Sequence, residues 1–240
     1  MPQLTDRLLR DAWAAYRRNA LRALGLAALL QSAMFSLQFL PSALQPAGMG
    51  LLVPVSVALE LALIVLLAQG DPASSDPEKP IWRTVREGLW PGIRALFISG
   101  FIVLPGWLIL ALIVGDRSIS PELQALGGIP LMAFFGAFTV VIYQPIALRG
   151  SRSALGAALT SIRVARRFFP VAFLITLVPE AAVTLSGITA MGGRRPDLAF
   201  SLAGAITAAL LLPFFYAAEN ALFFLVTRHV SQEPQAAPAE

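Results

Sequence analysis

The chain contains no cysteine and only one histidine among its 240 residues. Without cysteine there is no disulfide, no thiolate nucleophile and no cysteine-based metal site. His229 lies near the C-terminus, and the sequence holds no His-Glu-x-x-His, no Gly-x-Ser-x-Gly and no phosphate-binding Gly-x-x-x-x-Gly-Lys. We therefore expect no metal site, no cofactor and no catalytic residue, and we predict that the protein is not an enzyme.

Charge is also scarce. Charged residues make up 13% of the chain, hydrophobic residues 57%, and the mean hydropathy is +0.71. Soluble domains carry about 25% charged residues, so this composition indicates a membrane protein. The formal net charge of +4 fits basic residues at a membrane face, and we expect no nucleic-acid partner.

Six apolar runs are long enough to cross a bilayer, which takes about 18 residues or more. They cover residues 20–40, 49–69, 95–115, 127–148, 169–190 and 199–226. Barrel strands would be about 10 residues long and would alternate, so these runs indicate helices. The predicted fold class is all-α: a polytopic membrane protein with six transmembrane helices as three hairpins, each preceded by an amphipathic helix at the cytoplasmic face.

The basic residues predict the orientation. With six spans, the N-terminus, the second and fourth loops and the segment after the last span share one side, and they carry 15 of the 18 Lys and Arg. Short positive loops stay in the cytoplasm. We expect a multi-pass protein of the inner (cytoplasmic) membrane with both termini cytoplasmic. A single integral domain would cover residues 1–230, and the Pro/Ala/Gln-rich residues 231–240 would form a disordered tail.

A basic amphipathic stretch runs directly into a long apolar one three times, at 4–22 then 23–40, at 81–94 then 95–115, and at 153–167 then 168–191. Offsets of 72 and 77 residues align the three units, which predicts internal repeats of about 3–70, 80–150 and 152–228. Such amphipathic helices lie in the headgroup plane. The arginines expected at the membrane surface are Arg17, Arg18, Arg86, Arg94, Arg166 and Arg167.

Acids and amides also occur inside the predicted spans. The expected intramembrane polar cluster consists of Glu60, Tyr143, Gln144, Glu180, Glu219 and Asn220. A carboxylate at mid-bilayer costs about 2.5–3.5 kcal/mol on insertion scales, so it should face protein or water. Two interpretations remain open. The cluster binds a cation or polar solute where the repeats meet, or it only joins helices by hydrogen bonds, which is the interpretation we favour here.

Two motifs resemble a broad group of small six-span bacterial membrane proteins of unknown function, which includes the membrane domain fused to some glycerophosphodiester phosphodiesterases. Residues 12–19 read Ala-Trp-Ala-Ala-Tyr-Arg-Arg-Asn, similar to the Tyr-Arg-x-Asn that opens the first span in that group. Residues 158–161 read Ala-Leu-Thr-Ser, one residue shorter than the group's Ala-Leu-x-x-Ser, and Arg167 replaces its usual Gly. The resemblance implies the six-span layout and no catalytic residues.

The function expected from the sequence is that of a non-catalytic membrane protein: a scaffold, an assembly partner or a lipid-interacting module. Its partners would be the anionic lipids of the inner leaflet, attracted at about 1 kcal/mol for each basic residue, together with another membrane protein or a second copy. The alternative is a small transporter or channel for a lipid or small solute that uses the intramembrane carboxyls. A water-accessible cavity reaching Glu60 and Glu219 would favour the alternative, and a dry core would favour the scaffold.

Overall fold

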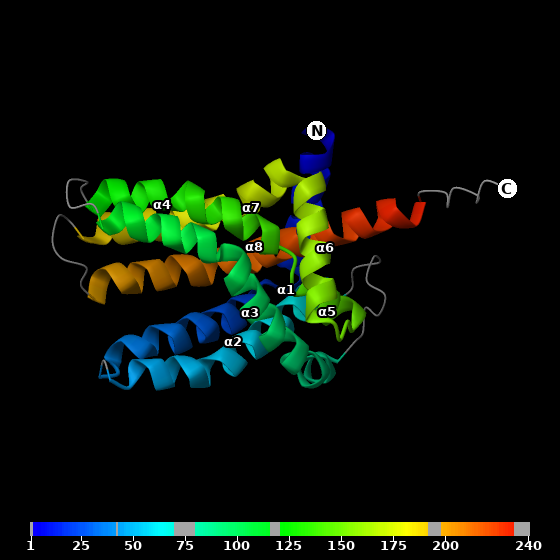
Figure 1. Cartoon of the computed structure of the whole chain (residues 1–240). Helices are drawn as coiled ribbons and strands as arrows, with labels where there is room; N and C mark the ends of the chain where they lie inside the picture. Colours follow the sequence, from blue (N-terminus) through cyan, green and yellow to red (C-terminus); the bar gives the residue numbers. More distant parts are fainter. Residues whose placement is uncertain (1, 42, 70–79, 116–120, 192–197, 233–240) are drawn as a thin grey trace.

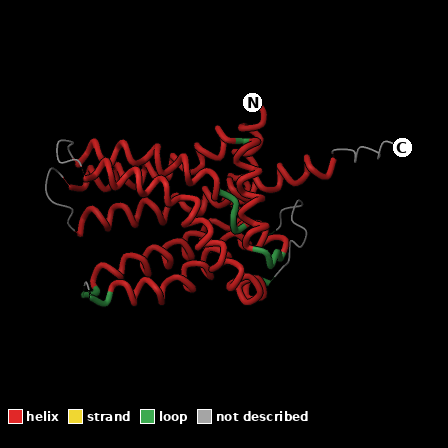
Figure 2. The backbone as a smooth tube through the Cα atoms, in the orientation of Figure 1, coloured by secondary structure: helices red, strands yellow, loops and turns green. Residues whose placement is uncertain are grey.

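The computed structural model describes residues 2–41, 43–69, 80–115, 121–191 and 198–232, and all regular structure within these ranges is helical (Figures 1 and 2). The α-helices are α1 (Pro2–Ser36), α2 (Gln45–Ala68), α3 (Ile81–Gly115), α4 (Pro121–Gly136), α5 (Gln144–Arg149), α6 (Ala154–Arg167), α7 (Phe169–Met191) and α8 (Leu198–Gln232). Short 3-10 helices are η1 (Leu37–Phe39) and η2 (Ala137–Thr139). The predicted all-α class is confirmed for this part of the chain, and the predicted tail lies outside it after Gln232.

Four helical stretches are long and apolar enough to cross a membrane, which marks the chain as a membrane protein. They are Gln45–Ala68, Ile81–Leu112, Gly127–Arg149 and Leu202–Thr227. The apolar part of α1 is not among them. In α7, the residues whose side chains the structure describes contribute only the shorter apolar stretch Phe169–Ala182. The first predicted span contains Arg22 and Gln31, which lower its hydropathy. The count of six spans therefore stays a prediction.

The long helices lie side by side and close into a ring. Along it, α1 contacts α2, α2 contacts α3, α3 contacts α4, α4 contacts α7, α7 contacts α8, and α8 returns to α1 (Figure 1). Further contacts join α2 to α8 across the ring. The helices α5 and α6 and the first part of α1 lie together at one end of this bundle (Figure 1).

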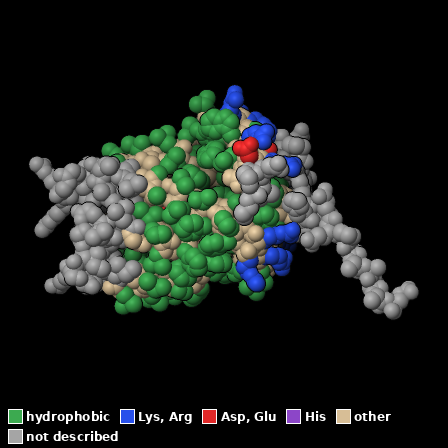
Figure 3. Space-filling model, turned by 90° about the horizontal axis from the view of Figure 1, so that it is seen from above, with side chains coloured by type: hydrophobic (Ala, Val, Ile, Leu, Met, Phe, Trp, Pro, Cys, Tyr) green, Lys and Arg blue, Asp and Glu red, His purple; other side chains and the backbone are tan. Residues whose placement is uncertain are grey.

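That end carries the described arginines, and we call it the basic end. Figure 3 shows Lys and Arg gathered there beside a broad hydrophobic surface. Among the exposed apolar side chains of α3, Phe101 is 74% exposed and Leu112 is 78% exposed. Large apolar patches of this kind mark a surface that faces another apolar phase, as a lipid-facing helix does. The three cations predicted on the other side, Arg117, Arg194 and Arg195, lie outside the described residues, as does Lys79 of the predicted cytoplasmic side.

The chain changes direction where the basic stretches meet the long helices. Within α1 the backbone leaves helical geometry at Asn19 (φ −122°, ψ 16°), and between α6 and α7 it does so at Phe168 (φ −127°, ψ 37°). At the first bend Asn19 Nδ2 donates to the carbonyl of Leu66, 2.9 Å away, and Arg18 donates to the carbonyl of Gln69 at 2.9 Å. These bonds fasten the bend to carbonyls at the C-terminal end of α2, where few helical amides remain to bond them, and among the described backbone amides Leu66 O accepts that of Gln69 at 3.3 Å.

The short helix α6 presents two apolar faces. It buries small side chains against the bundle, namely Ala154, Ala157, Ala158, Ser161, Val164 and Ala165. Leu155 and Leu159, which the sequence placed on the main apolar face, are exposed. Small residues let a helix approach its neighbours closely, whereas exposed leucines suit contact with lipid. Ser153 begins the helix by accepting a hydrogen bond from the Gly156 amide at 3.0 Å.

The predicted span at residues 127–148 matches one of the four stretches, Gly127–Arg149, but its helix is interrupted. Residues 127–148 do not run straight, because α4 ends at Gly136, η2 follows, and helical structure resumes only at α5. Pro145 explains the interruption, since it lacks an N–H and its ring would clash with the carbonyl of Val141 in an unbroken helix. At the start of α5 the same proline is tolerated. The Val141 amide freed by the break donates to Ser161 Oγ, 3.2 Å away.

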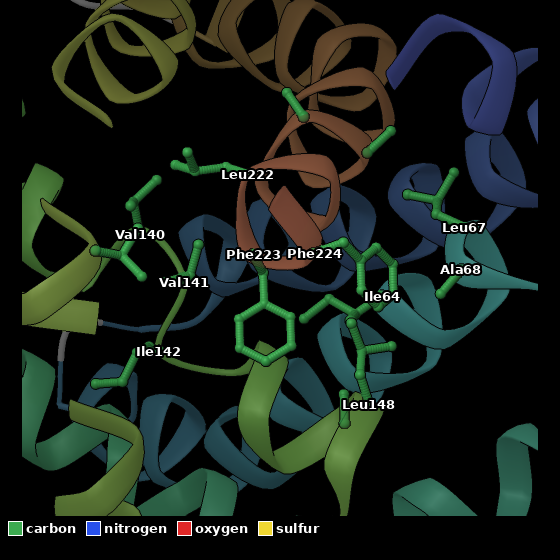
Figure 4. Packing of buried hydrophobic residues seen from close by; sticks show 14 of the residues in the cluster. Ile64, Leu67, Ala68, Val140, Val141, Ile142, Leu148, Leu222, Phe223 and Phe224 are labelled. Atoms are coloured by element: carbon green, nitrogen blue, oxygen red, sulfur yellow. The ribbon is translucent and has the colours of Figure 1, made fainter. Parts of the chain in front are cut away.

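The most densely buried part of the molecule is where α2, α5 and α8 converge near the basic end. Figure 4 shows Ile64, Leu148 and Phe223 in this core, one from each helix. All residues from 61 to 68 of α2 are buried. Lipid is as apolar as leucine, so such packing stabilises a membrane bundle through van der Waals contact and not through removal from water.

Two glycines allow α3 to approach this core. A Cβ at Gly88 would lie 3.2 Å from Leu61 Cδ1, and a Cβ at Gly92 would lie 2.6 Å from Val57 Cγ1. The glycines are four residues apart, so they lie on one face of α3. Their missing side chains set the distance between α3 and α2, the helix that carries Glu60.

Candidate functional site

The break in α4 brings a polar pair into the bundle. Because helical structure restarts at Gln144, this side chain lies at the beginning of α5, where it is 1% exposed. Its Nε2 donates to Oε2 of Glu219 on α8, 3.0 Å away. Two residues 75 positions apart in sequence are thereby joined inside the ring.

A second pair, formed by an acid and a phenol, lies beside the Gln144–Glu219 pair. Glu60 of α2 forms a side-chain hydrogen bond with Tyr216 of α8, the phenol being the donor to the carboxyl. Tyr143 and Glu219 are near enough to Glu60 to interact with it electrostatically. Five of the described polar groups within the ring, from α2, α8, α5 and the residue before α5, therefore form one neighbourhood.

Asn220 has a different role from its neighbour Glu219. It is 2% exposed, and its Nδ2 donates to the carbonyl of Ile64 at 2.9 Å, so it joins α8 to α2. Its Oδ1, together with Oη of Tyr143 and Oε1 of Gln144, is buried without a hydrogen-bond partner in the described structure. Unsatisfied buried polar atoms cost about 1–3 kcal/mol each in proteins, and their concentration here marks the neighbourhood as unusual.

Glu60 lines a first cavity of about 350 Å³. The cavity lies among α1, α2, α3 and α8, and its described lining is Leu30, Gln31, Met34, Met49, Leu52, Val53, Ser56, Glu60, Leu96, Leu212 and Tyr216. The lining is mainly apolar, with a carboxyl, an amide and two hydroxyls. We call it the Glu60 cavity.

Glu219 lines a second cavity of about 380 Å³. It lies among α1, α4, α7 and α8, and its described lining is Gln31, Met132, Gly136, Ile175, Thr176, Pro179, Glu180, Ala208, Leu211, Leu212, Phe215, Tyr216 and Glu219. Gln31, Leu212 and Tyr216 belong to both linings, so the two cavities adjoin. We call this one the Glu219 cavity.

Each acid lies at the end of its cavity that is nearer the basic end. The helices α2 and α8 both run toward the basic end, and Glu60 and Glu219 are the last of their lining residues. Beyond them the packing becomes tight: Leu61 and Asn220 are buried, and the core of Figure 4 follows. Both cavities therefore extend from the acids toward the opposite end of the bundle.

The structure brings most of the predicted polar cluster together. Glu60, Tyr143, Gln144 and Glu219 meet, whereas Glu180 is separate from that neighbourhood and lines the Glu219 cavity from α7. Sequence reasoning missed Tyr216 and Gln31. Tyr216 precedes Glu219 by three residues, a spacing that places both on one helical face, and this signal could have found it. For Gln31 the only signal in the sequence was that a polar residue lies in an apolar run.

Among the described residues, neither Glu60 nor Glu219 is paired with a cation. The ion pairs in the described part of the chain are Arg10–Asp6 at 3.1 Å and Arg83–Glu87 at 3.0 Å, both exposed. Within the same residues, no three His, Cys, Asp or Glu side chains group closely enough to hold a metal ion. A carboxyl has about four acceptor positions, so Glu60 and Glu219 retain capacity for a ligand that carries positive charge or hydrogen-bond donors.

The predicted surface arginines lie at the basic end, and three of them lie over aromatic rings. The guanidinium of Arg86 is 5.1 Å from the ring centre of Trp82, that of Arg94 is 5.5 Å from Trp90, and that of Arg167 is 5.8 Å from Phe168. Arg18 holds the end of α2, and Arg17 and Arg166 are exposed. Arginine with tryptophan is typical of the membrane–water interface.

Comparison with known proteins does not extend this description. No family model matches the chain, and no curated protein or solved structure matches it. The resemblance to six-span bacterial membrane proteins stays a prediction.

Proposed function

We propose that this protein is a non-catalytic six-span protein of the cytoplasmic membrane that binds a small solute at its intramembrane carboxyls and carries it across. The basic end would face the cytoplasm, as expected for short positive segments, with both termini on that side. The cavities would then extend from the acids toward the outer side. The role is that of a small transporter, which was the alternative interpretation of the sequence.

One observation carries the proposal: each of two neighbouring cavities ends at a carboxyl that has no cationic partner among the described residues. An acid is expensive in a membrane and normally faces a partner or a water-filled space. Hydrogen bonding that served only to pack helices would need no space beside Glu60 and Glu219. The volumes of both cavities also fall within the usual range for small-molecule sites.

A second candidate is the lipid-organising scaffold, and the basic end favours it. Trp82 and Trp90 are exposed beside Arg86 and Arg94, which suits anionic headgroups. This surface would hold any such protein at the membrane interface, whatever it does inside. It leaves the cavities and their acids without a role, so we rank it second.

Cysteine labelling tests the proposal on a chain that has no cysteine of its own. Ser56→Cys lies in the Glu60 cavity and Ala208→Cys in the Glu219 cavity. Leu61→Cys is the buried control, and Phe101→Cys is the lipid-facing control. The reagent is a charged, membrane-impermeant methanethiosulfonate, applied to right-side-out and to inside-out vesicles.

We expect both cavity cysteines to react from the outer side and, because a carrier alternates its access, more slowly from the inner side. The two control cysteines should stay unreactive. Cavity cysteines as unreactive as Leu61→Cys from both sides would indicate a dry core and contradict solute binding. If the cavity cysteines reacted from one side of the membrane only, both with and without added solutes, transport would be contradicted.

A further inference from the structure

The two cavities are lined by residues at matching positions of two different helices. Five lining residues of α2 pair with five of α8 at one constant separation along the chain: Met49 with Ala208, Leu52 with Leu211, Val53 with Leu212, Ser56 with Phe215, and Glu60 with Glu219. The two carboxyls therefore occupy the same place in their cavities. The same spacing follows from aligning Glu60, Tyr143 and Glu219 in the three proposed units of the sequence.

The lining residues contributed by the other helices also correspond when the three units are aligned. Gln31 of α1 in the Glu60 cavity corresponds to Glu180 of α7 in the Glu219 cavity, at the offset that aligns the first unit with the third. Leu212 of α8 lines the Glu60 cavity, and its counterpart Gly136 of α4 lines the Glu219 cavity, at the offset that aligns Tyr143 with Glu219. Each cavity is thus lined by one spanning helix, its return helix and the return helix of the preceding unit, and one residue of the next unit's spanning helix completes it: Leu96 of α3 in the Glu60 cavity and Gln31 of α1 in the Glu219 cavity.

Backbone geometry, which is independent of the cavities, agrees with this correspondence. The bends at Asn19 and Phe168 are separated by the same offset as Gln31 and Glu180, and they differ by only a few degrees in φ. Pro91 of α3 occupies the corresponding position in the second unit. Four residues after Asn19 and Phe168 lie Ala23 and Ala172, both 0% exposed. Matching bends and matching buried alanines at one offset are not expected from apolar composition alone.

We infer that the Glu60 and Glu219 cavities are two equivalent sites of a threefold pseudo-repeat, each of which takes one amphipathic cation, an ammonium ion with an apolar substituent. The inference rests on the proposed function and names its substrate class. In the second unit the corresponding position is Tyr143, so that unit has no acid at this place. The expected stoichiometry is two cations for each chain.

The chemistry of the lining selects this class of ligand. An unpaired carboxyl at the end of an apolar cavity attracts a cation and repels an anion such as a phosphate headgroup. Tyr216, in both linings, adds an aromatic face that favours ammonium groups. A bare Ca²⁺ ion needs about 6–8 oxygen ligands and Mg²⁺ about six, whereas no three His, Cys, Asp or Glu side chains of the described residues group closely enough to hold a metal ion. The apolar walls suit the hydrophobic part of the ligand.

The test uses two probes of similar shape and opposite charge. Binding of benzyltrimethylammonium and of phenylmethanesulfonate to the purified full chain in mild detergent is measured by isothermal titration calorimetry. The variants are E60Q, E219Q and the double variant, with E87Q, a surface acid at the basic end, as the matched control. Thermal unfolding of each variant reports whether it is folded.

We expect the wild-type chain and E87Q to bind two benzyltrimethylammonium ions, each single cavity variant to bind one, and the double variant to bind at least tenfold more weakly. The sulfonate should not bind. A stoichiometry other than two, equal binding of both probes, or single variants that lose both sites or neither would overturn the inference.

Two cavity-filling variants keep the test decisive if a Glu→Gln variant fails to fold. Met49→Trp and Ala208→Trp occupy equivalent positions and leave the carboxyls unchanged, and each should remove one site. If the sulfonate binds and Ala208→Trp blocks it, the cavities bind solutes but the cation class is wrong. If neither probe binds and the cavity cysteines do not react, the proposed function itself fails.

Discussion

Replacing Gly92 by alanine should destabilise the bundle, although alanine is the better helix former. An added Cβ would lie 2.6 Å from Val57 Cγ1 and 3.5 Å from Leu61 Cδ1. Val57 is buried and β-branched, so it cannot rotate away at low cost. Either α3 and α2 move apart or a side chain leaves its rotamer.

The magnitude follows from two opposing effects. Overfilling a packed core costs about 1–3 kcal/mol, and alanine in place of glycine favours a helix by about 0.8–1.0 kcal/mol. The same change at Gly100, also in α3, places a Cβ where nothing lies within 4 Å, so it should retain only the favourable effect. Gly92→Ala should therefore be about 1–3 kcal/mol less stable than Gly100→Ala, the difference being the cost of overfilling.

Thermal unfolding in detergent, followed by tryptophan fluorescence, measures this difference. For a chain of this size each kcal/mol corresponds to about 2–4 °C in Tm. Comparing the two variants cancels the general effect of glycine replacement within one helix. A Gly92→Ala protein at least as stable as Gly100→Ala would show that α3 does not approach α2 as closely as the structure has it.

Two further substitutions test the polar contacts. Gln144→Leu should destabilise the protein by about 0.6–1.7 kcal/mol, the range measured for hydrogen bonds between membrane helices, because it removes the donor to Glu219. Reversible unfolding in mixed micelles measures the loss, and an unchanged stability would contradict the contact. Asn220→Leu removes the bond to the Ile64 carbonyl and should cost a similar amount. Since this bond joins α8 to α2 beside both cavities, the variant should also bind benzyltrimethylammonium more weakly. A variant that is less stable but binds the ion normally would show that Asn220 contributes to helix packing and not to the cavities.

The membrane class and the helical fold were predictable because composition and run length alone report them. The cavity acids were predictable for a related reason: a carboxyl such as Glu60 or Glu219 is conspicuous in an apolar run. The sequence also predicted three repeated units from the offsets of 72 and 77 residues, which short matches by themselves could not establish. The interruption between α4 and α5 was not predicted, because the length and composition of residues 127–148 report an apolar run and not where its helix stops.

What a single sequence settles here is local chemistry: which segments suit lipid, where arginines concentrate, and which runs contain an acid. These depend on transfer free energies of individual residues and need no knowledge of neighbours. The tertiary structure decided the rest, because a cavity exists only where helices from different parts of the chain fail to fill the space between them. It placed Tyr216 beside Glu60, joined Gln144 to Glu219, and showed that α2 and α8, far apart in the sequence, line two adjoining cavities.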